Sequence, residues 1–221
     1  MKIATWNIER LKHKHDLADI VYSCEKIQAD ILVLTETDEQ VRPNCDCCYQ
    51  TPKLVEIQPD YYKSTENRVT VFTKYKCVRQ HTTYDKYTAL CVELETEHGN
   101  LLVYGTIIGI YGNRNPNFTA DLAKQIDDIQ RLSAYGDICV LGDYNLSFCD
   151  NYYFTKQGRA DVLQCFAENK ITLLTKDRPE CIDHIAISKR FTQGADIRIE
   201  EWNYDKSLSD HKGIAVSLDF K

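Results

Sequence analysis

The sequence predicts a layered α/β or α+β domain. Segments with the apolar pattern of strands are interleaved with segments whose apolar residues recur every three or four positions, as in amphipathic helices. A central pair of strand patterns around a short polar turn adds a hairpin to this order. The 221 residues contain no internal repeat and no low-complexity linker, and this length suits one domain. We therefore expect residues 1–221 to form a single domain in which helices cover sheets.

The first half of the chain has the pattern of strands around one helix. Residues 3–8 are expected to form a strand, and the helix that follows has apolar residues at positions 17, 20, 21, 24 and 27. Further strands are expected at residues 31–34, 69–73, 88–94 and 101–108. The last two are expected to form a hairpin with its turn at residues 97–100, because Gly99 and Asn100 tolerate the positive φ of such turns.

The second half continues the alternation of helices and strands. An amphipathic helix is indicated by apolar residues at positions 118, 122, 126, 129 and 132, and a further helix is expected around residues 161–168. A strand is expected between these helices at residues 138–141. The remaining strands are expected at residues 182–188, 197–202 and 213–220.

The composition excludes several classes of protein. With 43% hydrophobic and 27% charged residues, the chain is not disordered, collagen-like or a coiled coil. Its longest apolar run, residues 101–111, is interrupted by Gly105, Thr106 and Gly109, so we expect no membrane span. The first ten residues, MKIATWNIER, lack the features of a signal peptide. We therefore expect an intracellular, cytoplasmic protein.

Ten cysteines are scattered through the chain, and without an export signal we expect reduced thiols rather than disulfides. Cys77, Cys91, Cys139 and Cys165 have apolar neighbours, which is typical of small core residues. A polar, turn-like cluster contains Cys45, Cys47 and Cys48. It could bind a soft metal or form a disulfide, although its spacing lacks the paired C-x2-C pattern of structural zinc sites. The role of this cluster is left open.

Polar side chains gather where several expected strands end. Burying such groups costs free energy unless they are paired, so these ends are the candidate site. Each has a structural explanation by itself, such as a turn cap for Asn7, a solvated strand end for Glu36 and an Asx turn for Asp143 and Asn145. The polar segments are Trp6-Asn7, Thr35-Glu36, Gly142-Asp143-Tyr144-Asn145, Ile182-Asp183-His184 and Ser209-Asp210-His211.

Taken together and in this order, these segments closely resemble the endonuclease/exonuclease/phosphatase superfamily. The resemblance extends from Asn7 to His211 and is carried by TWN, LTE, LGDYN and LSDH. The superfamily includes exonuclease III-like AP endonucleases, DNase I, inositol polyphosphate phosphatases and neutral sphingomyelinases. The resemblance implies a DNase I-like, four-layer fold, in which two sheets form a sandwich with helices on both outer faces. It also implies an active site at one edge, where strand ends and loops converge.

The residue types alone are compatible with metal-assisted phosphoester hydrolysis. Carboxylates and amides without a Cys/His cage suit Mg²⁺ or Mn²⁺. Hydrolysis of a phosphoester needs charge neutralisation, an activated water and a hydrogen-bond donor near the phosphate. We expect Glu36 to bind the metal.

The resemblance implies catalytic roles for five further residues. Asp143 would orient or deprotonate the attacking water, and Asn145 and Asn7 would hold phosphate oxygens or ligands of the metal. His211 would donate a hydrogen bond to the scissile phosphate, and Asp183 would orient it and stabilise its charge.

The neighbours of this catalytic pair are expected to differ in role. Asp210 would be a metal ligand or would lie next to the ligands. His184 directly follows Asp183, and on a strand it should point to the opposite side. We therefore expect His184 to be a structural residue.

The sequence departs from the superfamily at one position. Ile107 occupies the place where many members carry a His or Tyr that contacts the phosphate. Tyr111 or Arg114 in the following loop could substitute, because a guanidinium can bind phosphate with two hydrogen bonds. A solvated loop residue is an equal alternative for Arg114.

Charge bears on the substrate. The formal net charge is −6, from 27 Lys+Arg and 33 Asp+Glu, whereas a dedicated duplex-DNA binder usually presents a basic face. A local basic run, residues 12–15 (Lys12, His13, Lys14 and His15), could meet a phosphate backbone or a phosphorylated head group. It could equally be a solvated entry to the helix.

We expect an Mg²⁺- or Mn²⁺-dependent phosphoester hydrolase, namely a phosphodiesterase or nuclease whose substrate can be a nucleic acid. One alternative is a phosphomonoesterase acting on a small phosphorylated molecule or an inositol phosphate. Another is a binding protein on the same fold that has lost catalysis, which Ile107 favours. The joint presence of five site residues argues against that last alternative: Glu36, Asp143, Asn145, Asp183 and His211. The sequence leaves the natural substrate and the oligomeric state open.

Overall fold

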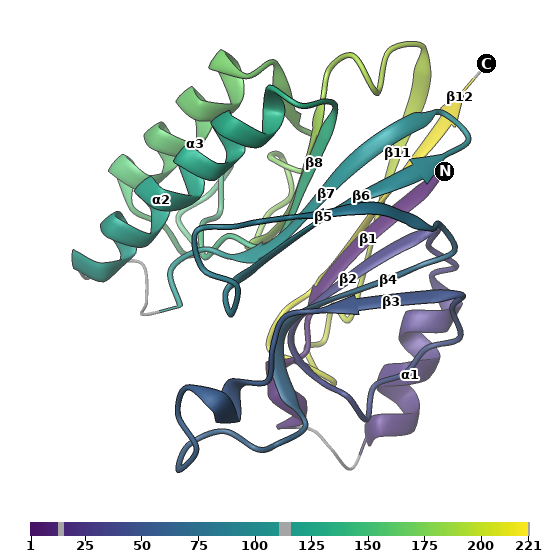
Figure 1. Ribbon diagram of the computed structural model, residues 1–221, viewed down its shortest axis with the longest axis vertical. Helices are drawn as coiled ribbons and strands as arrows, with labels where there is room; N and C mark the ends of the chain where they lie inside the picture. Colours follow the sequence, from purple (N-terminus) through teal and green to yellow (C-terminus); the bar gives the residue numbers. More distant parts are fainter. Residues whose placement is uncertain (13–15, 111–115, 221) are drawn as a thin grey trace.

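Two six-stranded sheets pack face to face in the computed structural model, which describes residues 1–12, 16–110 and 116–220. Helix α1 covers the outer face of one sheet, and helices α2 and α3 cover the outer face of the other (Figure 1). The expected sandwich of two sheets between outer helices is therefore confirmed. The helices span Leu17–Lys26 (α1), Pro116–Ser133 (α2) and Lys156–Glu168 (α3).

The first sheet has the strand order β11-β12-β1-β2-β4-β3. Strands β1 and β2 are parallel and are joined through α1, whereas the other neighbours are antiparallel. The strands are β1 (Lys2–Asn7), β2 (Ile31–Asp38), β3 (Cys47–Gln50), β4 (Glu66–Thr73), β11 (Ala195–Trp202) and β12 (Gly213–Phe220).

The second sheet repeats this plan in the order β5-β6-β7-β8-β10-β9. Strands β7 and β8 are parallel and are joined through α2, and the other neighbours are antiparallel. The strands are β5 (Cys77–His81), β6 (Ala89–Thr96), β7 (Gly99–Ile107), β8 (Ile138–Asp143), β9 (Ile171–Leu173) and β10 (Asp183–Ser188).

Strand alternation explains why the core forms three layers. Successive side chains of a strand point to opposite faces of its sheet. In β2, Ile31 and Val33 therefore enter the core between the sheets, whereas Leu32 and Leu34 pack in the cluster with α1. A third cluster lies between the second sheet and α2 and α3.

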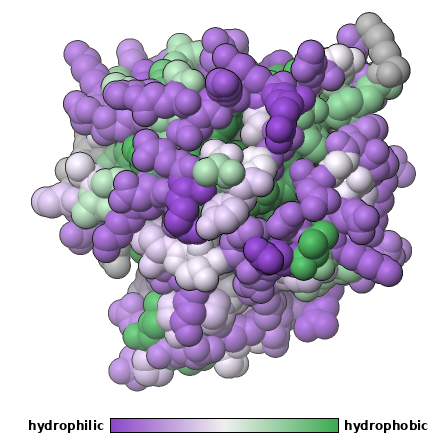
Figure 2. Space-filling view, turned by 45° about the horizontal axis from the view of Figure 1, so that its top comes forward, coloured by the Kyte–Doolittle hydropathy of each residue, from purple (hydrophilic) through white to green (hydrophobic). Residues whose placement is uncertain are grey.

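Most of the face in Figure 2 is hydrophilic, and its hydrophobic residues form small patches.

The structure contains three short strands that the sequence patterns do not predict, namely β3, β5 and β9. The residues Cys47 and Cys48 belong to edge strand β3, so the expected turn-like cluster is in part a strand. Edge strands of three to five residues are partly exposed and lack a clear apolar period, which explains the omission.

Two smaller expectations are corrected by the structure. The hairpin of β6 and β7 turns at Glu97 and His98, since Thr96 pairs with Gly99. Gly99 has the positive φ (105°), while Asn100 lies within β7. Cys77 is only half-buried, unlike Cys91, Cys139 and Cys165, which are core residues as expected. All ten cysteines lie in the described part of the chain, and each is a free thiol there.

The 3-10 turns η1 (Glu9–Leu11) and η3 (Leu54–Glu56) lie in the loops after β1 and before β4. Among the helices of residues 1–12, 16–110 and 116–220, none has the length and apolar character required to cross a membrane.

Candidate active site

Strand ends from both sheets meet at one edge of the sandwich. Strands β1 and β8 end there at Asn7 and Asp143, and β10 begins there at Asp183. A hydrogen bond of 3.1 Å from Asn7 Nδ2 to Asp143 Oδ2 joins the two sheets directly. The polar strand ends singled out by sequence are therefore brought together.

Three donors orient the Asp143 carboxylate. The backbone amide of Asn145 donates to Oδ1 (2.8 Å), while the side-chain amides of Asn145 and Asn7 donate to Oδ2 (3.2 and 3.1 Å). Asn145 adopts a left-handed backbone conformation (φ 50°), which Asn tolerates better than most residues. Its side chain also donates to the carbonyl of Ile108 (2.9 Å). The Asp143 carboxylate is thus held in one orientation at a 3% exposed position.

Gly142 allows strands β7 and β8 to lie close together just before Asp143. Its φ is +135°, and a Cβ atom there would lie 2.0 Å from the Thr106 carbonyl oxygen. Real side chains do not reach such a distance, so a glycine is required before Asp143.

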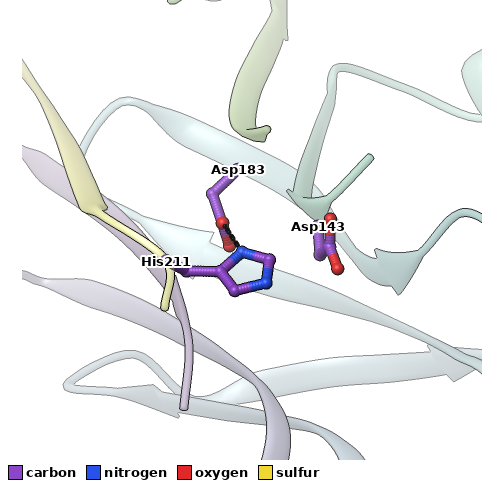
Figure 3. Close-up of side chains that lie close together, drawn as sticks. All are labelled: Asp143, Asp183 and His211. Carbon is purple, nitrogen blue, oxygen red and sulfur yellow. Dashed lines mark hydrogen bonds and ion pairs between the residues drawn. The ribbon is translucent and has the colours of Figure 1, made fainter. Parts of the chain in front are cut away.

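His211 and Asp183 form a buried pair. His211 Nδ1 lies 2.6 Å from Asp183 Oδ2, and the side chains are 11% and 1% exposed. Figure 3 shows the His211 ring in contact with the Asp183 carboxylate, with the Asp143 side chain close by. Burial lowers the pKa of His211, but the negative charges of Asp183 and Asp143 outweigh it and raise the pKa to about 10. The imidazole is therefore cationic at neutral pH.

Burial has the opposite effect on the pKa of Asp143. Burial raises its pKa to about 7, and the charges of Asp183 and Glu36 add to this effect, while His211 opposes it. Two buried carboxylates near one imidazolium leave negative charge that this histidine offsets only in part. A carboxyl group whose pKa lies near neutral pH can accept a proton from water.

Hydrogen bonds fix the backbone before β12. Ser209 Oγ donates to the carbonyl of Asn7 (2.6 Å) and accepts from the amide of His211 (3.2 Å). The carbonyl of His211 accepts from Trp6 Nε1 (3.0 Å) and Asn203 Nδ2 (2.7 Å). The imidazole is thereby fixed relative to Asn7 as well as to Asp183.

Glu9 belongs to the site but was missed by sequence reasoning. It is 6% exposed, and its backbone amide donates to Asn7 Oδ1 (2.9 Å), which leaves the Asn7 amide group facing Asp143. Its carboxylate accepts from the Asp210 amide (2.9 Å) and from Lys12 Nζ (2.7 Å). Burial raises the pKa of Glu9, but these hydrogen bonds outweigh it and hold the pKa below its usual value.

The turn that carries Glu9 is strained. Glu9, Arg10 and Leu11 all have left-handed φ values, of 49°, 54° and 52°. Each such residue costs ~1–2 kcal/mol when it is not glycine. The turn aims Arg10 at Glu36, whose Oε2 lies 3.6 Å from Arg10 Nε. Nothing in the apolar pattern of the sequence signals this conformation.

Glu36 and Asp210, the two expected metal ligands, lie at the rim. Their side chains are 33% and 67% exposed, and Asp210 Oδ1 is 3.4 Å from His211 Nε2. The tightest group of possible ligand atoms in the described residues consists of Asp143, Asp183 and His211, all within 4.8 Å of one another. Glu36 and Asp210 lie outside that group.

The donor set fits Mg²⁺ or Mn²⁺. Within the described part of the chain, the candidate ligand group consists of two carboxylates and one imidazole without a cysteine, and hard divalent cations prefer oxygen ligands. Asp183 Oδ1 is buried without a hydrogen-bond partner in the described residues, and the pKa of Asp143 is raised by neighbouring carboxylates as well as by burial. A bound cation would stabilise the charged forms of the Asp183 and Asp143 carboxylates.

The chain is similar to known proteins in structure rather than in sequence. No protein-family model matches the sequence, and no curated protein matches it significantly. Solved structures do match. An endonuclease/exonuclease/phosphatase from Beutenbergia cavernae DSM 12333 is 15% identical with a TM-score of 0.70, and the alignment covers 100% of this chain and 71% of that one.

Two further structures are similar along their whole length. The endonuclease domain of TRAS1, a telomere-specific non-LTR retrotransposon, is 13% identical with a TM-score of 0.70 over 99% of this chain and 98% of that one. An endonuclease/exonuclease/phosphatase family protein from Leptotrichia buccalis C-1013-b is 14% identical with a TM-score of 0.69 over 100% of both chains. This chain has the endonuclease/exonuclease/phosphatase fold.

The remaining candidate residues of this endonuclease/exonuclease/phosphatase fold are Ile107, Tyr111 and Arg114. Ile107 is 1% exposed and pairs with Asp143 across β7 and β8, so it supplies no polar group there. Tyr111 and Arg114 lie outside the described residues, as do residues 13–15 of the basic run.

His184 lies on the other side of β10 in this fold, as the strand period predicts. Its ring contacts Tyr144 and Phe148, and its Nε2 and Nδ1 atoms lie 2.9 Å from the Leu146 carbonyl and the Thr175 hydroxyl. Burial lowers the pKa of His184 to about 4. It is a neutral core histidine.

Proposed function

We propose that this protein is a divalent-metal-dependent phosphodiester hydrolase of the nuclease type. The observation that carries the proposal is the arrangement of Asp183, His211 and Asp143, in which the imidazole contacts one buried carboxylate and lies close to a second. The fold hosts several activities, and the nuclease type is proposed by analogy with the TRAS1 endonuclease domain, which is similar along the whole chain.

His211 would bind the scissile phosphate. Its Nδ1 proton is directed to Asp183, so Nε2 is the atom that can donate to a phosphate oxygen. As an imidazolium it would also offset the negative charge that grows in the transition state. Asp183 acts as the positioning residue, because it fixes the ring and stabilises its positive charge.

Asp143 would orient and deprotonate the attacking water. Three donors hold its carboxylate, and a pKa of about 7 suits a general base at neutral pH. Asn7 and Asn145 supply those donors, and the side-chain amide of Asn7 would also contact a phosphate oxygen. Preorganised amides of this kind need no rearrangement during the reaction.

Glu36 and Asp210 would hold the metal at the rim, and Asp143 and the side-chain oxygen of Asn145 would offer further oxygen donors. When bound, Mg²⁺ or Mn²⁺ would neutralise phosphate charge and make a bound water more acidic.

The proposal is tested by incubating supercoiled plasmid with the purified protein and Mg²⁺, Mn²⁺ or EDTA. The same assay is run with the His211→Ala variant, to exclude a contaminating nuclease. The matched control is His98→Ala, because His98 is exposed in the hairpin at the far end of β7. A second substrate, bis-para-nitrophenyl phosphate, reports diester hydrolysis without any nucleotide.

We expect nicking that needs metal, that persists in His98→Ala and that is lost in His211→Ala. Release of inorganic phosphate from small monoesters, with no diester cleavage, would favour a phosphomonoesterase instead. Absence of hydrolysis on every substrate with either metal would contradict an enzymatic role and favour a binding protein on this fold.

A further inference from the structure

Two groups of tyrosines and basic residues flank the candidate site. The first, called the Arg10 group, consists of Arg10, Tyr61, Tyr62 and Arg68. The Arg10 guanidinium carbon lies 5.1 and 5.3 Å from the ring centroids of Tyr61 and Tyr62, and that of Arg68 lies 5.7 Å from the Tyr62 ring. The two tyrosine rings meet edge to face at 4.7 Å.

The Arg10 group is connected to the site and open to solvent. Arg10 reaches Glu36 at 3.6 Å, so the group begins where the expected metal ligands lie. Tyr61 is 59% exposed, in the loop between β3 and β4 that projects beyond the sheets beside η1 (Figure 1). Contact with Arg10 restrains the Tyr61 ring, and the exposed part of Tyr61 is available for further contacts.

The second group, called the Tyr152 group, consists of Tyr152, Tyr204 and Lys206. Lys206 Nζ lies 4.5 Å from the Tyr152 ring centroid and donates to its hydroxyl (2.7 Å). Tyr152 and Tyr204 are 46% and 67% exposed. Tyr152 is in the loop that follows Asn145, and the other two residues are in the loop that leads to Ser209 and His211.

The strand order places these groups on opposite sides of the site. Along the sheet the order is β11, β12, β1, β2 and β4. The pairings of Trp202 with Gly213 and of Asp38 with Glu66 bring the end of β11 and the start of β4 to the edge where Asn7 lies. Tyr204 follows β11, and the tyrosines of the Arg10 group precede β4. Four strand intervals span ~19 Å, which is longer than one nucleotide.

Proteins bind single-stranded nucleic acid with exposed aromatic rings that lie beside positively charged side chains. Each unpaired base can stack on a ring, and the cations contact the adjoining phosphates. In an intact duplex the bases are already stacked inside and cannot reach such rings. A net charge of −6 also argues against a broad duplex-binding face.

We infer that a single-stranded polynucleotide crosses this site, with unpaired bases stacked on Tyr61 at one side and on Tyr204 at the other. The scissile phosphate would then lie between the two groups, so the strand would be cut internally. This inference rests on the proposed function for its chemistry, but its binding surface can be tested separately.

The test measures binding in EDTA, where metal-dependent cleavage does not interfere. Fluorescence anisotropy of a labelled oligothymidylate of about 20 nucleotides is compared with that of the same strand in a duplex, and an oligouridylate arm separates DNA from RNA. The variants are Tyr61→Leu, Tyr204→Leu and the conservative Tyr61→Phe. The matched control is Tyr22→Leu, because Tyr22 is 61% exposed on α1. Circular dichroism checks that each variant is folded.

We expect single strands to bind more tightly than duplex. Because stacking on one ring contributes a factor of about ten or more, each Leu variant should weaken binding about tenfold, while Tyr61→Phe and Tyr22→Leu bind as the unaltered protein does. Equal binding by the Leu variants, or tighter binding of duplex, would overturn the inference.

The two proposals can fail separately. Hydrolysis of bis-para-nitrophenyl phosphate without binding of any single strand would overturn the inference and leave the hydrolase intact. Tyrosine-dependent binding without hydrolysis of any diester would support the stacking surface and contradict the hydrolase.

Discussion

His211 Nδ1 lies 2.6 Å from Asp183 Oδ2, although the two residues are 28 positions apart in the chain. The contact joins the start of β10 in one sheet to the loop before β12 in the other. It fixes both the orientation and the charge of the imidazole, and it occupies the centre of the sandwich edge.

Replacement of Asp183 by Asn should therefore impair catalysis without unfolding the protein. The amide keeps the shape but removes the charge that raises the pKa of His211, so His211 in metal-free protein should titrate at a lower pH than in the unaltered protein. The imidazole would then be cationic over a narrower pH range, and we expect kcat to fall by ~100-fold or more. NMR titration of the His211 ring and plasmid nicking measure the two effects.

The matched control for this prediction is Asp219→Asn. Asp219 also pairs with a basic residue, Arg198, but it is half-exposed on β12, and exposed ion pairs contribute little. An unchanged His211 titration in Asp183→Asn would show that the contact does not set the charge of the imidazole.

Asn7→Asp tests the link between the sheets. The Asn7 amide donates to Asp143 Oδ2 at 3.1 Å, and a carboxylate there would replace the donor by a like charge. The pKa of Asp143 should rise further, and we expect activity at neutral pH to fall by ~100-fold. The pH profile of diester hydrolysis measures this change, and its rising limb should move to higher pH.

The corresponding control is Asn100→Asp. Asn100 likewise donates to a carboxylate, Glu93 Oε1 (2.9 Å), but at an exposed position at the start of β7. If both variants lost activity equally, the effect would be one of net charge and not of the contact with Asp143.

Sequence patterns predicted the parts of the site that follow from strands. The apolar runs of β1, β2, β8 and β10 locate their polar ends, so the segments that contain Asn7, Glu36, Asp143 and Asp183 could be identified. The side-chain alternation of a strand also separates Asp183 from His184 correctly. Which strand ends meet depends on pairing between the sheets, and only the resemblance to a known superfamily supplied that.

The patterns could not predict the parts that depend on irregular backbone. Glu9 and Arg10 lie in a left-handed turn of three non-glycine residues, a conformation that local propensity disfavours. Their roles come from tertiary contacts with Asp210 and Glu36. The loop before β4 is equally unpredictable, because the role of Tyr61 and Tyr62 depends on their tertiary contact with Arg10.

Gly142→Ala should destabilise the fold. The added Cβ would lie 2.0 Å from the Thr106 carbonyl oxygen, so β7 and β8 would have to separate just where Asp143 is held. Gly194→Ala is the matched control, because Gly194 also has a positive φ (+82°) but an added Cβ there would have no heavy atom within 4 Å. We expect Gly142→Ala to lower the free energy of unfolding by at least ~2 kcal/mol more than the control does. Urea denaturation measures the difference, and equal losses would mean that φ alone requires the glycine.

His184 should make the protein sensitive to acid. The Leu146 carbonyl can only accept, so Nε2 carries the proton and Nδ1 accepts from the Thr175 hydroxyl. Burial lowers the folded-state pKa to about 4, whereas the unfolded-state pKa is about 6.5. Between these values the unfolded chain binds more protons, so the stabilisation is complete above pH ~6.5 and is lost as the pH falls through ~4.

The expected loss from this residue is ~3 kcal/mol over that interval. Urea denaturation at several pH values measures it. In His184→Gln the protein should be less stable at pH ~7 but should lose less stability on acidification, because Gln does not titrate in this range. In His98→Gln, where the exposed ring is replaced, the acid dependence should match that of the unaltered protein. An unchanged acid dependence in His184→Gln would show that this histidine is not the source of the acid sensitivity.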